Sequence, residues 1–199
     1  MNGYGGAGTL SDGKYNITTE FGGDLHNYVG RETAMELMEY VDSVLCGMGG
    51  SEAKLYDTDS ALKTKALQYD LHLLGAKVRH LGTDRNVEIL GRIFDYISGT
   101  IETKFFTTLT KVEKTEGGFK VSTSKGEEFF CKDLVLAAGR SGSKWISSVC
   151  DDLGIGQRKN RVDIGVRVEL PAEIFKHITD VVYESKFVYQ TDKYNDLVR

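Results

Sequence analysis

The sequence predicts an α/β fold, because three patterns occur together along its 199 residues. An apolar run at 134–138 ends on Gly139, as in a strand that is buried on both faces and then turns into a helix. Apolar positions three and four residues apart predict amphipathic helices before and after this run. Between these helical regions the period changes to two, which predicts short antiparallel strands.

Five segments with apolar residues at helical spacing predict the helices. Most of them begin at a side chain that can cap a helix or end at a glycine. The first has its apolar positions between Ala34 and Leu45 and ends at Gly47. The others are expected from Asp59 or Ser60 to Leu73, from Thr83 or Asp84 to Gly99, from Ser143 to Gly154, and at 173–178.

The strands follow from alternation and turn residues. Residues 3–24 are rich in glycine and are expected to be irregular. A short strand is expected at 77–79, and further strands at 162–170 and 181–190. An antiparallel meander is expected in about 100–131, with strands at 101–106, 109–114, 119–124 and 128–131. The polar face of 162–170 carries Asp163, Arg167 and Glu169, which are either a solvated surface or the lining of a substrate cleft.

Composition and charge exclude several classes of protein. The net charge of −4 is spread without blocks of one sign, so the sequence offers no basic surface for nucleic acid or membrane lipid. No window approaches the ~18 continuous apolar residues of a membrane span, and the N-terminus lacks the apolar core of a signal peptide. The three cysteines and four histidines have no metal-ligand spacing. We therefore expect a cytoplasmic protein with a small-molecule substrate and no metal site.

Two literal motif matches near the N-terminus lack the context that their chemistry needs. Residues 3–8 fit GxGxxG, but no buried strand precedes them and turn residues follow, so a dinucleotide fingerprint is not predicted. Residues 8–14 fit GxxxxGK, but Tyr15 stands where a phosphate-binding loop has its Ser or Thr.

Four longer strings carry a more specific signal when they are taken together. GYGGAGTLSDGKYNITTEFGGDL at 3–25, VRHLGTD at 78–84, LVLAAGRSGSKW at 134–145 and NRVDIGVRVELP at 160–171 resemble, in this order, a family of FAD-dependent dehydrogenases also labelled NAD-utilising dehydrogenases. The resemblance implies a truncated FAD/NAD(P)-binding, Rossmann-like fold. It implies a partial FAD-binding domain at 1–156 and the beginning of a substrate domain at 157–199, since members of the family are longer at both ends.

The resemblance also implies the cofactor and the reaction. The parent activity would be hydride transfer between FAD and either NAD(P)H or an organic substrate, with FAD supplying the redox chemistry. Lys14 would stabilise negative charge on the reduced flavin, and His80 would donate a proton near it; both are candidate catalytic residues. A lone histidine at a strand end is more often a hydrogen-bonded structural residue, and this is the alternative for His80. The loop beneath the flavin would consist of Gly5, Gly6, Ala7, Gly8, Ser11, Asp12 and Gly13.

Two further segments would contact the nucleotide. The backbone of Thr108 and Leu109 would face the adenine, although plain sheet pairing accounts for these residues equally well. Ala137, Ala138, Gly139 and Arg140 would pass the pyrophosphate, and Arg140 can instead be a surface cation.

A second class of function stays open. The chain can be a non-catalytic module, that is, a truncated or degenerate flavoprotein that binds a nucleotide or a partner without turnover. A chain that lacks the first nucleotide-binding unit would bind FAD weakly or not at all, and its glycine-rich end would be mobile. It would also expose an open sheet edge, through which we expect self-association.

Overall fold

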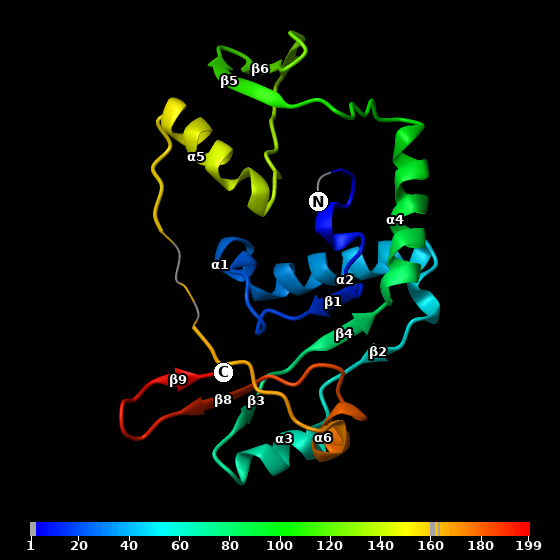
Figure 1. Cartoon of the computed structure of the whole chain (residues 1–199), viewed down its shortest axis with the longest axis vertical. Coiled ribbons are helices and arrows are strands. Elements are labelled where there is room, and N and C mark those ends of the chain that lie inside the picture. Colours follow the sequence, from blue (N-terminus) through cyan, green and yellow to red (C-terminus); the bar gives the residue numbers. More distant parts are fainter. Residues whose placement is uncertain (1–2, 160–161, 163) are drawn as a thin grey trace. The chain divides into compact units, whose positions relative to one another are not determined.

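The structure is a computed structural model that describes residues 3–159, 162 and 164–199, and it is mixed α/β with three small antiparallel sheets (Figure 1). The predicted α/β class is therefore confirmed. The chain divides into two compact units, Met1–Ile101 with Val168–Arg199, and Glu102–Arg167. The boundary expected between residues 156 and 157 rests on the resemblance alone and stays a prediction.

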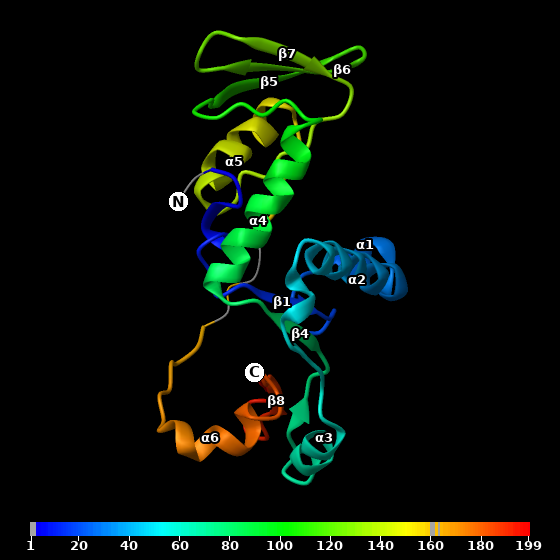
Figure 2. The ribbon, with the colours of Figure 1, turned by 90° about the vertical axis from the view of Figure 1, so that its right-hand side faces the viewer.

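The larger unit is built around a three-stranded sheet in which β4 (Lys77–His80) lies between β1 (Lys14–Ile17) and β2 (Leu55–Tyr56). Helix α2 (Arg31–Gly47) packs along β1, and α4 (Thr83–Ser98) follows directly on β4 (Figures 1 and 2). The core forms where the helices meet the sheet, because each helix buries its apolar side there. Its central residues are Leu45, Ala53, Leu81 and Ile89.

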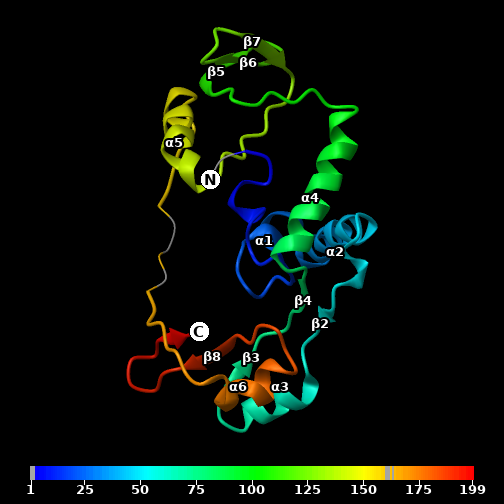
Figure 3. The same cartoon turned by 45° about the vertical axis from the view of Figure 1, so that its right-hand side comes forward.

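A second sheet of this unit contains β3 (His72–Leu73), β8 (Phe187–Gln190) and β9 (Leu197–Val198), with β8 in the middle (Figure 3). Helix α3 (Ser60–Leu67) packs against β3, and α6 (Ala172–Thr179) precedes β8 in the chain. The remaining short elements of the unit are α1 (Leu25–Val29), η1 (Gly6–Gly8) and η2 (Gly50–Glu52).

The described part of the smaller unit contains three of the four predicted meander strands, together with one longer helix and a short helix before it. Strands β5 (Leu109–Thr115), β6 (Gly118–Thr123) and β7 (Glu128–Cys131) pair in sequence order, and α5 (Ser143–Asp152) packs on them. The short helix η3 (Arg140–Gly142) leads into α5. The core of this unit contains Val112, Val121 and Val149, each less than 7 % exposed.

The predicted helices are confirmed, with one correction to their length. Helix α3 ends at Leu67 and not at Leu73, because Asp70 takes a left-handed backbone conformation (φ 56°) and Leu71 N–H closes the end on the carbonyl of Ala66. Its predicted cap is present, since Asp59 accepts a hydrogen bond from Leu62 N–H at 2.6 Å. The expectation that residues 3–24 are irregular was wrong at Lys14–Ile17, which form β1.

The buried parallel strand predicted at 134–138 is absent, and this prediction was wrong. No described strand pairs with these residues. Only Leu134 and Leu136 pack on the core of the smaller unit, whereas Val135 between them is 87 % exposed. The apolar run therefore has one face in contact with the core, and a central parallel strand needs two.

Three other predicted strands are absent or shorter than expected. At 101–106, Phe106 is almost fully exposed with a left-handed backbone (φ 50°), which a strand does not accommodate. The described part of 162–170 has no sheet partner, and its apolar side chains, Val162, Ile164, Val166, Val168 and Leu170, are exposed. Asp163 lies outside the described residues. Of 181–190, only β8 is a strand, because residues 180–186 form the loop that follows α6.

The central sheet of the larger unit ends at β1 on one side and at β2 on the other. Self-association through an open edge stays a prediction. Within the described residues, no helix has both the length and the apolar character that crossing a membrane requires.

Candidate functional site

The glycine-rich loop, residues 3–13, lies against α4. Buried Asn86, one turn into that helix, donates from its amide nitrogen to the carbonyl oxygens of Gly8 (2.7 Å) and Thr9 (3.0 Å). The Tyr4 ring packs against Phe94 with the ring centroids 5.1 Å apart. The structure thus gives this segment a defined place, on the helix that follows β4.

Gly13 marks the point where the loop becomes β1. Its φ of +66° is left-handed, and a Cβ there would lie 2.9 Å from the carbonyl oxygen of Gly82. Two hydrogen bonds extend the β1–β4 ladder into the loop, from Leu81 N–H to the Gly13 oxygen (2.9 Å) and from Gly82 N–H to the Asp12 oxygen (3.1 Å). Only glycine accommodates both the conformation and the close backbone approach.

Lys14 and His80, the two candidate catalytic residues, are direct cross-strand partners in the β1–β4 register. The Lys14 ammonium lies 2.6 Å from Oε2 of Glu184. The His80 ring stacks on Tyr183, with centroids 4.2 Å apart and planes 25° apart. Tyr56 from β2 in turn packs against Tyr183, with the two ring centroids 5.4 Å apart. Three strands, β1, β2 and β4, and the loop before β8 therefore meet in one polar and aromatic cluster, which we call the Lys14–His80 cluster: Lys14, Tyr56, His80, Tyr183 and Glu184.

The electrostatics of the cluster keep Lys14 charged. Contact with Glu184 raises the pKa of Lys14 above its ordinary value and outweighs the opposing effect of partial burial. The carboxylate of Asp12 adds a smaller effect in the same direction. Burial raises the pKa of the Tyr183 hydroxyl, with Asp12 again contributing, so that Tyr183 stays neutral at physiological pH.

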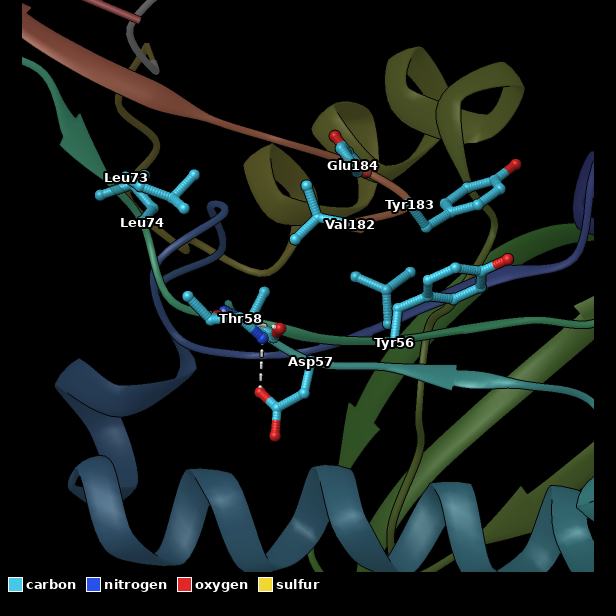
Figure 4. Close-up of a pocket in the computed structure, with 10 residues that line it drawn as sticks. Tyr56, Asp57, Thr58, Leu73, Leu74, Val182, Tyr183 and Glu184 are labelled. Carbon is cyan, nitrogen blue, oxygen red and sulfur yellow. Dashed lines mark hydrogen bonds between the residues drawn. The ribbon is translucent and has the colours of Figure 1, made fainter. Parts of the chain in front are cut away.

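A small cavity adjoins the cluster. Its volume is about 10 Å³, roughly the space of one water molecule, and Figure 4 shows Tyr56, Tyr183 and Glu184 among the residues that line it. A wider hollow of about 380 Å³ lies at the opposite end of β1 and β4, where Ile17 pairs with Lys77. The cluster itself is thus a surface arrangement of side chains beside a water-sized space.

Chemically, the cluster combines a fixed positive charge with an imidazole. A protonated lysine stabilises negative charge that develops on a bound group, and a histidine can exchange a proton near neutral pH. Within the described residues, no group of three His, Cys, Asp or Glu side chains has the arrangement of a metal site.

The remaining predicted contacts lie in the smaller unit. Thr108 is engaged with Ser124, whose N–H donates to the Thr108 oxygen at 2.8 Å, and Leu109 begins β5 opposite Thr123. This arrangement corresponds to the sheet-pairing alternative. Ala137 and Ala138 are exposed in the irregular segment, Gly139 has a φ of +65°, and Arg140 begins η3.

Sequence reasoning missed Tyr183, Glu184 and Asn86. The first two were assigned to one long strand, and nothing in their local sequence indicates contact with β1 or β4. Asn86 had a detectable signal, since it shares the inward spacing of Ile89 and Ile93 on α4. A polar residue on the apolar side of a helix indicates a buried hydrogen-bonding role.

Comparison with known proteins returned no matching family model, no matching curated protein and no matching solved structure.

Proposed function

We propose that this chain forms part of the flavin site of an FAD-dependent oxidoreductase that transfers hydride between FAD and NAD(P)H or an organic substrate. The observation that carries the proposal is the cross-strand pairing of Lys14 with His80. The two residues were selected from separate sequence strings, one after the glycine-rich loop and one in VRHLGTD, and they meet at the end of that loop. The two strings are therefore adjacent in the fold, as residues of one site must be.

The loop suits the cofactor on physical grounds. The tether from Asn86 uses carbonyl oxygens of the loop, and the N–H groups of Gly6, Ser11 and Gly13 already donate hydrogen bonds within it. Backbone N–H groups of such a loop are the donors that bind ribityl and phosphate oxygens. Gly6 is left-handed and has open space where a Cβ would lie, so a ligand can approach the backbone closely there, whereas Gly5 and Gly13 face Thr9 and Gly82. Residues 5–8 and 11–13 would hold the cofactor.

FAD, when bound, would supply hydride transfer. Lys14 would hold a positive charge where electrons accumulate, and its raised pKa keeps that charge in place across the neutral range. His80 would hold or deliver a proton on the same side of the sheet. The contacts proposed for Thr108, Leu109 and residues 137–140 depend on the same resemblance and remain part of the proposal.

Titration with FAD tests the proposal. The 199-residue chain and a version extended by the sequences that flank it in its gene are both purified and titrated, with flavin fluorescence and absorbance as readouts. We expect weak or no binding by the chain alone and a bound flavin in the extended protein. Lys14→Met in the extended protein should slow flavin reduction by NAD(P)H about 100-fold, within the range for removing one charge-stabilising group.

The matched control is Lys77→Met, at the other end of the same sheet, where the ammonium pairs with Glu39 on the surface. Flavin content and reduction rate should be unchanged in that variant. Absence of flavin from the extended protein would refute the proposal.

Two observations favour the non-catalytic alternative. Lys14 already has a counter-ion in Glu184, and Thr108 and Leu109 already use their backbone in the sheet. A nucleotide-binding module without turnover would bind FAD or ADP, but NAD(P)H would not reduce the bound flavin.

A further inference from the structure

The loop between α6 and β8, residues 180–186, is anchored to the rest of the larger unit on both sides of Tyr183 and Glu184. Val182 is buried, and the Lys186 carbonyl accepts a hydrogen bond from Leu74 N–H at 2.9 Å. The Lys186 ammonium donates to the Phe21 oxygen at 3.2 Å. Anchors before and after the two residues fix the path of the backbone that carries them.

Glu184 is held between two ammonium groups. Its Oε2 contacts Lys14, and its Oε1 lies 3.6 Å from Lys186. The Lys14 and Glu184 side chains are 30 % and 23 % exposed, so partial burial strengthens this contact relative to an open surface pair. A carboxylate held at both oxygens fixes the position of the lysine that it contacts.

Tyr183 restrains the His80 side chain, as Glu184 restrains Lys14. Its ring covers the imidazole face, and Tyr56 packs on Tyr183 in turn. Figure 4 shows Tyr56 and Tyr183 side by side, each from a different part of the chain. The stack restricts rotation of the imidazole about its side-chain bonds, and that rotation decides which direction the ring nitrogens face.

We infer that Tyr183 and Glu184 are positioning residues for the Lys14–His80 pair: Glu184 places the ammonium of Lys14, and Tyr183 orients the ring of His80. This inference depends on the proposed flavin function for its chemical meaning. It adds the loop 180–186 to the pair of candidate catalytic residues on β1 and β4.

The first experiment needs no flavin. In the 199-residue chain, NMR follows the titration of the Lys14 ammonium and the His80 ring. Glu184→Gln should shift the Lys14 titration to lower pH, because Gln cannot supply the negative charge, and Glu184→Asp should restore part of the shift. Glu39→Gln, which breaks only the surface pair with Lys77, should leave Lys14 unchanged.

The aromatic contact is tested by a conservative pair of variants. Tyr183→Phe keeps the ring and should preserve the His80 resonances and their ring-current shifts, whereas Tyr183→Leu should change them. Circular dichroism confirms that each variant is folded. An unchanged Lys14 titration in Glu184→Gln, or equal His80 spectra in the Phe and Leu variants, would overturn the inference.

The second experiment uses the flavin-containing extended protein. Glu184→Gln should move the alkaline limb of the pH profile of flavin reduction to lower pH, and Tyr183→Leu should slow reduction about 10- to 100-fold, with Tyr183→Phe near the unsubstituted rate. If the protein binds no flavin, the proposed function fails whatever the NMR result. If flavin is bound and reduced but these variants behave like the parent, only the positioning inference fails.

Discussion

The Tyr15 hydroxyl donates a 2.8 Å hydrogen bond to Oδ1 of Asn86, which ties β1 to the first turns of α4. The amide nitrogen of the same asparagine holds the carbonyls of Gly8 and Thr9. One side chain, fully buried, therefore connects the glycine-rich loop, the strand that carries Lys14 and the helix that follows His80.

Replacing Asn86 with alanine should lower the free energy of unfolding by about 3 kcal/mol, because several buried polar groups lose their partner together. Hydrogen exchange should also increase in residues 3–13. Chemical denaturation followed by exchange mass spectrometry measures both effects. Asn27→Ala on the exposed surface of α1 is the control, and it should cost less than about 0.5 kcal/mol. Equal effects in the two variants would show that Asn86 does not anchor the loop.

Arg79 and Asp42 form an ion pair that connects β4 to α2, with Arg79 Nη2 2.8 Å from Asp42 Oδ2 and both side chains less than 15 % exposed. Asp42→Asn should cost about 3–5 kcal/mol, since it leaves a buried guanidinium without its counter-ion. Glu39→Gln breaks an exposed pair between the same two elements and should cost at most about 1 kcal/mol. Urea unfolding compares them; similar midpoints for the two variants would contradict the assignment of a buried pair.

The sequence predicts features that depend on residues close together in the chain, and it misses features that depend on tertiary packing. The helices α2, α4 and α5 follow from apolar spacing within one segment, and the β5–β7 hairpins follow from alternation around their turns. The run at 134–138 has the apolar residues of a buried strand. A strand in a sheet also needs other strands to pair with, and the composition of the run does not show whether they are present. The same limit applies to 162–170.

The candidate site likewise contains residues that the sequence indicates and residues that only tertiary packing brings to it. Lys14 and His80 were selected because each lies in a distinctive string of residues. Glu184 and Tyr183 reach them only through tertiary packing, from a loop far along the chain, and their local sequence predicted a strand. β1 was missed because KYNI is too short and too mixed in polarity to show an alternating pattern, and only its pairing with β4 defines it.

Alkaline pH should destabilise the larger unit through Lys14. Its contact with Glu184 raises the folded-state pKa above the ordinary 10.5, so the stabilisation is complete below that pH and is lost as the pH rises through the folded-state value. Burial also raises the folded-state pKa of Tyr183 above 10.0, so the stability of the fold again decreases as the pH rises. Urea midpoints from about pH 8 to about pH 11 should therefore fall, and less steeply in Lys14→Met.

The tyrosine contribution to this pH dependence is removed separately by Tyr183→Phe. If the slope is unchanged in Lys14→Met and is abolished by Tyr183→Phe alone, the ion pair does not contribute to the alkaline loss of stability.

Substitutions in the smaller unit test the correction at 134–138. Val112 is 3 % exposed in the core between β5, β6 and α5, so Val112→Ala should cost about 2 kcal/mol from lost burial and a residual cavity. Val135, 87 % exposed, should tolerate the same change within about 0.5 kcal/mol. A buried central strand would make the two substitutions equally costly. Thermal or urea unfolding of the two variants distinguishes these cases, and a large loss of stability in Val135→Ala would restore the strand that the sequence predicted.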